Sequence, residues 1–144
     1  MKASAEANPD PLAAALGTVG DRWTLLTVAA LLDGAQRFGS LQEHLPGIAP
    51  NVLSDRLRRL ERARLVVAQP YSDRPPRFVY ELTASGRELA GALRLLSDWG
   101  ARHASGEVDP PRHEVCGTPL EARWWCPTCE QPVEGDDAEH LRFA

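Results

Sequence analysis

The change of hydrophobic spacing near Leu65 constrains the fold of this chain more than any other feature. Before it, apolar residues recur at helical spacing in four short runs, and the first three runs end at glycine or proline. Two β-prone runs follow at 65–71 and 78–82, and the six residues between them include two prolines. A long helical pattern then begins after Thr83. The chain is therefore expected to be mainly α-helical with one small β-hairpin.

Start and stop signals place the four short helices. The signals are Asp10-Pro11 and the breaks at Gly17 and Gly20 for the first helix, Asp21 and Asp33-Gly34 for the second, Phe38 and Pro46-Gly47 for the third, and Pro50 and Ala63 for the fourth. The fourth helix follows Ala49, which has no side-chain acceptor for the free N–H groups, at a cost of about 1 kcal/mol. Two helices joined by a tight turn therefore stand just before the hairpin.

Helix, turn, helix and β-hairpin in this order form a winged helix-turn-helix, in which the second helix enters the major groove of DNA. Leu53, Leu57 and Leu60 mark the inner face of that helix, so its polar residues turn outward. Arginine, asparagine and serine can hydrogen-bond to base edges or phosphates. The predicted DNA-binding residues are Pro50, Asn51, Ser54, Asp55, Arg58, Arg59 and Arg62 on the helix, with Arg74 and Arg77 on the hairpin.

The charge distribution supports a DNA partner, although the net charge of −4 alone argues against one. Residues 50–80 contain seven arginines and three acidic residues, a balance of +4, which leaves −8 for the rest of the chain. The alternative is a solvated helix face with internal ion pairs, such as Asp55 with Arg59 and Glu61 with its arginine neighbours. Because the positive charge coincides with the groove helix and the hairpin, DNA binding is favoured.

Several segments resemble the HxlR family of bacterial transcriptional regulators. They are GDRWTLL (20–26), LLDGAQRF (31–38), LPGI (45–48), VLSDRLRRLE (52–61), PPRFVYELTASG (75–86) and LSDWG (96–100). The resemblance implies a homodimer, joined through the first and last helices of a domain at 8–105, that binds a roughly palindromic operator in double-stranded DNA. We expect a repressor or autoregulator.

The last helix of that domain carries an apolar seam too wide for a small domain to cover, which also predicts a partner subunit. The expected dimer-interface residues are Leu12, Leu16, Leu89, Leu93, Leu96, Trp99 and His103. An apolar pocket near Trp23, Phe38 or Trp99 could accept a small aromatic effector.

The three cysteines all lie within a second predicted domain at 106–144, and with His113 they form the spacing H-x2-C-x9-C-x2-C. Two such pairs on two turns can hold Zn²⁺ tetrahedrally, as in a small β zinc ribbon. The predicted ligands are His113, Cys116, Cys126 and Cys129. Glu130 stands where such turns usually have glycine, and His140 could replace His113. A redox pair of Cys126 and Cys129, or unligated thiols, are the alternatives.

An enzyme built on these cysteines, with the winged helix as an interaction module, is a further alternative. His44 and His103 lie in helical patterns without a nearby nucleophile, and the order of residues differs from that of zinc deaminases, so no catalytic residue is predicted. Trp124 and Trp125 are expected in the core of the small domain, and its acidic end (Glu134, Asp136, Asp137, Glu139) should be repelled by DNA. With no secretory signal and no apolar run of about 20 residues, we expect a cytoplasmic protein without a membrane partner.

Overall fold

The structure is a computed structural model that describes residues 10–104, 106 and 108–133. It divides into two compact units, Met1–Leu93 and Arg94–Ala144. Because this division falls inside the last long helix, the boundary between the predicted domains 8–105 and 106–144 stays a prediction. The expectations for His140 and for the acidic end lie outside the described residues.

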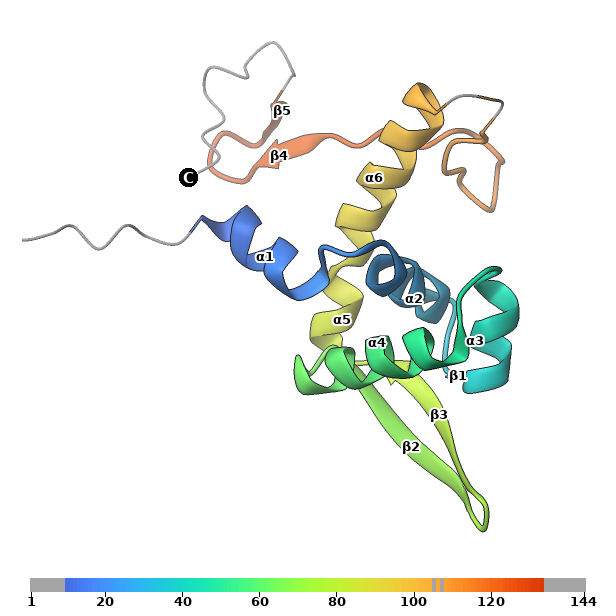
Figure 1. The fold of residues 1–144 in the computed structure, drawn as a ribbon. Coiled ribbons are helices and arrows are strands. Elements are labelled where there is room, and N and C mark those ends of the chain that lie inside the picture. The colour runs from blue at the N-terminus through green and yellow to red at the C-terminus, as the bar shows by residue number, and fades with distance from the viewer. Residues whose placement is uncertain (1–9, 105, 107, 134–144) are drawn as a thin grey trace, which may run out of the picture. The chain divides into compact units, whose positions relative to one another are not determined.

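The first unit has the predicted succession of four helices, a β-hairpin and a further helical segment, with one additional short strand, β1 (Figure 1). Its elements are α1 (Pro11–Val19), α2 (Arg22–Leu32), β1 (Gln36–Arg37), α3 (Phe38–His44), α4 (Pro50–Arg62), β2 (Val66–Asp73), β3 (Pro76–Leu82) and α5 (Ala84–Glu88), followed by the start of α6 (Ala90–His103). The mainly α-helical class with a β-hairpin wing is confirmed.

The helix caps follow the local sequence. The Asp10 carboxylate accepts from the Leu12 N–H at 3.0 Å, and the Thr83 hydroxyl accepts from the Gly86 N–H at 3.1 Å. Ala49 makes no side-chain capping bond to α4, as predicted. The expected break at Gly17 is wrong, because α1 continues through this residue to Val19. A single helical glycine costs only about 1 kcal/mol, which is too little to end a helix.

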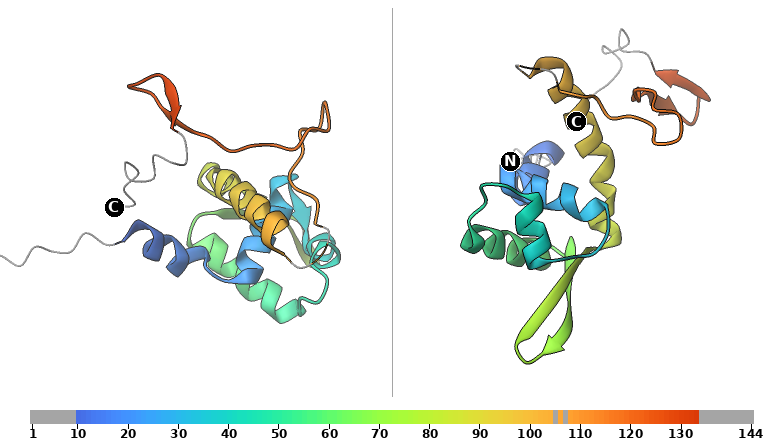
Figure 2. Two further views of the ribbon diagram at one scale, coloured as in Figure 1. Left: turned by 90° about the horizontal axis from the view of Figure 1, so that it is seen from above. Right: turned by 90° about the vertical axis from the view of Figure 1, so that its right-hand side faces the viewer.

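The hairpin is longer than the sequence indicates. Strands β2 and β3 pair from Val66 opposite Leu82 to Asp73 opposite Pro76, so the predicted turn at 72–77 narrows to Arg74-Pro75. Pro70 lies within β2, where proline is tolerated because β2 is an edge strand in the order β1-β3-β2. Figure 1 and the right-hand view of Figure 2 show this hairpin extending well beyond the helices of the first unit.

One core joins the helices to the base of the hairpin. Its buried side chains include Val28, Leu31, Leu41, Leu45, Ile48, Leu53, Leu57, Leu60, Leu65, Val66 and Leu82. Three of these leucines lie along α4 and are almost completely buried, which confirms the inner face predicted for that helix. The opposite face of α4 is therefore fixed toward solvent by the burial of the leucines.

The predicted long helix after Thr83 is divided into α5 and α6 at Leu89, so its expected continuity is wrong. The Leu89 N–H bonds to the Gly86 carbonyl three residues back, at 3.3 Å, and the four-residue spacing resumes where Leu93 bonds to Leu89. Leu89 and Leu93 both pack against the core. The division lets α5 pack closely on the end of β3 before α6 continues.

The second unit continues α6 and adds β4 (Trp124–Cys126) paired with β5 (Gln131–Val133). None of its described side chains is buried. Trp124 and Trp125 are 56% and 61% exposed, so the core expected around them is wrong. The physical reason is that a hairpin of two three-residue strands offers no second layer to cover them. Within the described chain, no helix is long and apolar enough to cross a membrane.

Candidate nucleic-acid interface

The solvent face of α4 is cationic. Arg58, Arg59 and Arg62 are exposed, with Asn51 and Asp55 nearer the start of the helix, and Ser54 is half-buried. No acidic residue lies in the first turn and Ala49 provides no side-chain cap, so the N–H groups at this end keep their partial positive charge. Both features suit an approaching phosphate or base edge.

Several predicted DNA-binding arginines are free of carboxylate partners. Among the described residues, Arg58, Arg62, Arg74 and Arg77 take part in no ion pair. Asp55 pairs with its neighbour Arg56, its Oδ2 lying 2.6 Å from Nη1, rather than with Arg59 as the solvated-face alternative expects. The positive charge of this surface therefore remains available to a polyanion.

Arg56 has a different role, because it joins α4 to α2. Its Nε lies 2.8 Å from Oδ1 of Asp21, the residue that caps α2 by accepting from the Trp23 and Thr24 N–H groups. Burial opposes ionisation of Asp21, but hydrogen bonds from the Thr24 hydroxyl and from Arg56 outweigh it and hold the pKa of this carboxyl below its usual value. The Asp21 carboxylate thus caps α2 and also orients α4.

Replacing Asp21 tests this link. Asp21→Ala is expected to lower the free energy of unfolding by about 2 kcal/mol, about 1 from the lost cap and up to about 1 from the partly exposed ion pair. Asp21→Asn, which can still cap, should lose only the ion-pair part. Because folding lowers the pKa of Asp21, the stabilisation from its ion pair is present above the unfolded pKa of about 3.9. This stabilisation is lost as the pH falls through the pKa of Asp21 in the folded protein.

Urea unfolding at pH 7 and at pH 3 measures both effects. The difference between the wild-type protein and Asp21→Asn should shrink at the lower pH. An equal difference at the two pH values would contradict the role of the charged carboxylate.

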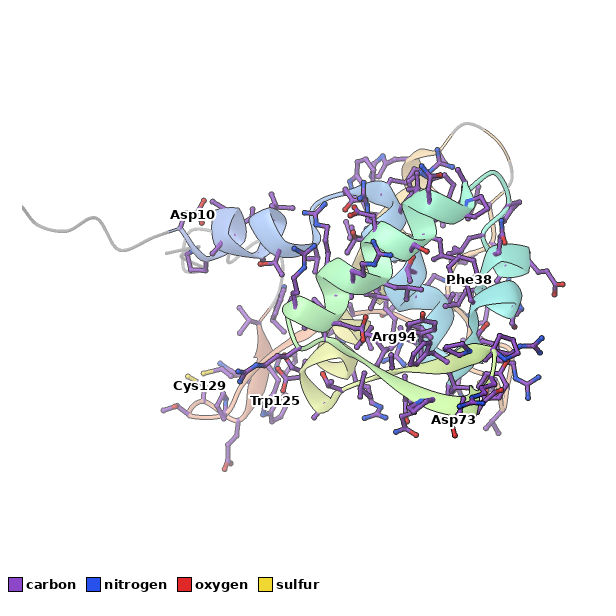
Figure 3. The ribbon with its side chains drawn as sticks, turned by 60° about the horizontal axis from the view of Figure 1, so that its bottom comes forward. Asp10, Phe38, Asp73, Arg94, Trp125 and Cys129 are labelled. Atoms are coloured by element: carbon purple, nitrogen blue, oxygen red, sulfur yellow. The ribbon has the colours of Figure 1, made fainter. Side chains whose placement is uncertain are left out.

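The wing brings a further arginine to the interface that the sequence reasoning missed. The pairing of β1 with β3 places Arg37 opposite Val79, and its guanidinium lies 4.5 Å from the centre of the Tyr71 ring. The register of the hairpin shifts between Pro70 and Ser72, so Tyr71 is the extra residue of a bulge. Bulges re-aim side chains, and here the result is an exposed aromatic and cationic pair beside the wing. Figure 3 labels Asp73 near the wing tip and Phe38 at the start of α3.

The end of α4 is closed by an arginine in a conformation that favours glycine. Arg64 has φ of +59°, and the Leu65 N–H donates to the Leu60 carbonyl at 2.9 Å, which makes a Schellman motif. A left-handed arginine costs roughly 1–2 kcal/mol more than glycine. The side chain it retains is exposed and adds to the positive charge of the α4 surface. This position therefore combines local backbone strain with a charge that suits DNA.

The HxlR-like helix-turn-helix family model matches residues 18–108, which include α2 to α6 and the wing. The chain belongs to the HxlR-like family. An uncharacterised HTH-type transcriptional regulator of Mycobacterium tuberculosis is 39% identical over 122 residues, which are 83% of this chain and 77% of that protein. YtcD of Bacillus subtilis, also an uncharacterised HTH-type transcriptional regulator, is 34% identical over 62% of this chain and 71% of its own length.

Solved structures agree with this assignment. A structure from Pseudomonas aeruginosa, named as a candidate transcription factor, is 32% identical with a TM-score of 0.69 and covers 88% of each chain. The redox regulator HypR in its oxidised form is 28% identical with a TM-score of 0.62, covering 67% of this chain and 99% of its own. The present protein is therefore a transcriptional regulator of the winged-helix type, and the resemblance found in its sequence is confirmed.

The residues predicted for the dimer interface of this HxlR-like protein fall into two groups. Leu89 and Leu93 are half-buried against the core of their own chain. Leu12 and Leu16 on α1 are 65% and 54% exposed. On α6, Leu96 and Trp99 are also exposed, and the Trp99 ring lies 5.0 Å from that of His103. The interface stays a prediction, and the side chains free to form it are those of the exposed group.

Two of the three aromatic residues considered for an effector pocket, Trp23 and Phe38, lie in the first unit and have different surroundings. Trp23 packs against the core beneath Arg22, whose guanidinium lies 4.7 Å from its ring. Phe38 lines an open groove of about 360 Å³ together with residues of β1, α3 and the wing, which are Arg37, Gly39, Tyr71, Pro76, Arg77, Phe78 and Tyr80. Of the three aromatic residues, Phe38 is the one that lines this groove, which lies beside the wing.

The predicted zinc ligands form two separate pairs. His113 Nδ1 lies 3.2 Å from Cys116 Sγ, and hydrogen bonds from Thr118, then His113, lower the pKa of the Cys116 thiol to about 7. Hydrogen bonds from the Cys129 backbone N–H and thiol lower the pKa of the Cys126 thiol. The hydrogen bond that the Cys129 thiol makes to Cys126 raises the pKa of Cys129. In the described part of the chain, no cluster joins three or more possible ligands. The structure thus assembles each pair but does not bring the pairs together.

Proposed function

We propose that this protein is a homodimer that binds a roughly palindromic operator in double-stranded DNA and acts as a repressor or autoregulator. The observation that carries the proposal is the set of exposed arginines on α4 and the wing that are without carboxylate partners in the described chain. Such side chains suit base edges in the major groove and phosphates at its borders. A repressor needs only to occupy its site, which this surface can do.

The two-fold symmetry of the proposal rests on exposed apolar surface. Leu12 and Leu16 on α1, and Leu95, Leu96 and Trp99 on α6, present large apolar side chains to solvent. Exposed apolar surface of this kind marks protein–protein contacts, and a second copy of the chain offers the same surface. A dimer would carry two α4 helices, and two half-sites about one helical turn apart would match them.

The site of action and the signal follow from the same proposal. A bacterial protein that binds operators works in the cytoplasm, where the DNA is. The groove at Phe38 supports a small-molecule effector, because aromatic rings and two arginines line it. HypR is named as a redox regulator, and Cys116, Cys126 and Cys129 keep redox sensing as the alternative signal for this chain.

Binding to the DNA upstream of the protein's own gene tests the proposal. A gel shift in the presence of excess unrelated DNA should show a specific complex of dimer size. Its affinity should fall with salt, with a logarithmic slope of about −0.9 for each phosphate contact. The same complex with unrelated DNA, at equal affinity and salt slope, would contradict sequence-specific regulation. Sedimentation of the free protein should give the mass of a dimer, and a monomer at micromolar concentration would remove the symmetric operator.

A further inference from the structure

The described part of the segment after α6 has ordered turns but no buried apolar core that could stabilise them. From Arg94 onward, none of the described side chains is buried, and Val115, Trp124 and Trp125 are among its exposed large hydrophobic residues. Segments of this size without a core usually depend on disulfides or a metal. The three cysteines are free thiols, so no disulfide stabilises the described part of this segment.

The first turn presents His113 and Cys116 on the same side. The Gly117 N–H donates to the His113 carbonyl at 2.7 Å, and the His113 N–H donates to the Thr118 carbonyl at 2.9 Å. These bonds close the turn and leave the imidazole beside the thiol. Gly117 then adopts the left-handed region, with φ of +69°. A turn of this form lets successive backbone N–H groups face a thiolate sulfur.

The second turn repeats this arrangement with two thiols. Cys126 ends β4, and Cys129 follows in the turn before Gln131 begins β5 (Figure 3). Cys126 and Gln131 are partners in the strand register, so the turn is held from both sides. Glu130, like Gly117, has a positive φ, here +52°. The strained backbone of Glu130 indicates that the turn requires a left-handed residue at this position, whatever its side chain.

Because the two turns have the same form, a single metal ion bound by donors from both turns is favoured. In each turn, two soft or borderline donors lie three positions apart, and a left-handed residue follows the second donor. Two donors make a weak metal site, whereas three thiolates and one imidazole complete a tetrahedral set for Zn²⁺. The nine residues between Cys116 and Cys126 can span about 30 Å when extended, so they can also fold back and bring the turns together.

We propose that His113, Cys116, Cys126 and Cys129 of one chain bind one structural Zn²⁺, which closes the two turns onto each other. Four protein ligands leave no open position for catalysis, so the role of the metal is to order the segment. This proposal does not depend on the DNA-binding function, because all four ligands lie outside α4 and the wing.

Titration of the reduced, metal-free full-length chain with Co²⁺ tests the site. We expect saturation at one Co²⁺ per chain, the visible bands of tetrahedral thiolate coordination, and displacement of Co²⁺ by Zn²⁺. Cys116→Ser and Cys126→Ser remove one ligand from each turn, and each should weaken binding by about 100-fold or more. The matched control is Glu130→Gly, which removes the backbone strain and no ligand, and should bind at least as tightly as the wild-type chain.

Three outcomes would overturn the proposal. If Cys116→Ser leaves the affinity and the Co²⁺ spectrum unchanged, the first turn is not part of the site. Saturation at one metal for every two chains would place the ligands on different subunits. A reduced chain that takes up no metal from excess Co²⁺ or Zn²⁺ would leave Cys126 and Cys129 as a dithiol, which is the redox alternative.

Discussion

Replacing Gly86 with alanine is expected to lower the free energy of unfolding by about 3 kcal/mol. An added Cβ at this buried position would lie 2.2 Å from the Leu65 carbonyl oxygen and 3.0 Å from Leu82 Cδ2. The Leu65 carbonyl cannot move freely, because it accepts the Thr83 N–H at 3.0 Å. Alanine gains up to about 1 kcal/mol in helix propensity over glycine, which is less than the clash costs.

Gly91 provides the matched control. It is exposed on α6, has no heavy atom within 4 Å of an added Cβ, and does not have a positive φ. Gly91→Ala should therefore raise the free energy of unfolding by about 0.5–1 kcal/mol, through the entropy of the unfolded chain. Thermal and urea unfolding should show opposite signs for the two variants. Equal effects would contradict the close packing of α5 against Leu65 and the end of β3.

Replacing Arg58 with alanine is expected to weaken binding to the preferred DNA site by about 1–3 kcal/mol and to reduce discrimination between base pairs. Arg58 is exposed in the middle of α4, and its side chain takes part in no ion pair of the described chain. Alanine is a good helix former, so the stability of α4 should not fall. The loss should therefore be confined to DNA recognition, and fluorescence anisotropy with matched and mismatched sites measures it.

Arg77→Ala should behave differently, because Arg77 lies on the wing, where contacts to the DNA backbone are expected. Its affinity for all sequences should fall alike, and the logarithmic salt slope should become shallower by about 1. The control is Arg102→Ala, which removes the same charge from α6, where Arg102 pairs with Asp98 at 2.9 Å. If Arg58→Ala and Arg77→Ala reduce affinity and discrimination equally, the assignment of α4 to the groove is wrong.

Much of the fold could be predicted because burial and local capping agree. Leu53, Leu57 and Leu60 have helical spacing and are buried together, and Asp21 and Thr83 cap the helices that follow them. Strand β1 was missed because two polar residues carry no periodic signal, and only its pairing with β3 makes it a strand. The division at Leu89 depends on the packing of α5, which the leucine spacing of the helix does not reveal.

The site was predicted less completely, because long-range contacts decide which arginines are available. Arg56 and Arg58 lie two residues apart on α4, yet Arg56 is paired with Asp21, a residue distant in the sequence, and Arg58 is exposed. Arg37 reaches the wing only through the β1–β3 register and the bulge at Tyr71. The outward direction of Asn51, Asp55 and Arg58 follows from helix geometry alone, and the structure confirms that these residues are exposed.

A dimer in which α4 and the wing read a specific DNA sequence should select its operator from whole genomic DNA. Sequencing of the genomic fragments retained by the purified protein, in competition with excess unrelated DNA, measures this selection. We expect one enriched motif with two inverted half-sites centred about 10 base pairs apart, and the loss of that enrichment for Arg58→Ala. Retention of fragments without a shared motif, or an unchanged motif for Arg58→Ala, would contradict it.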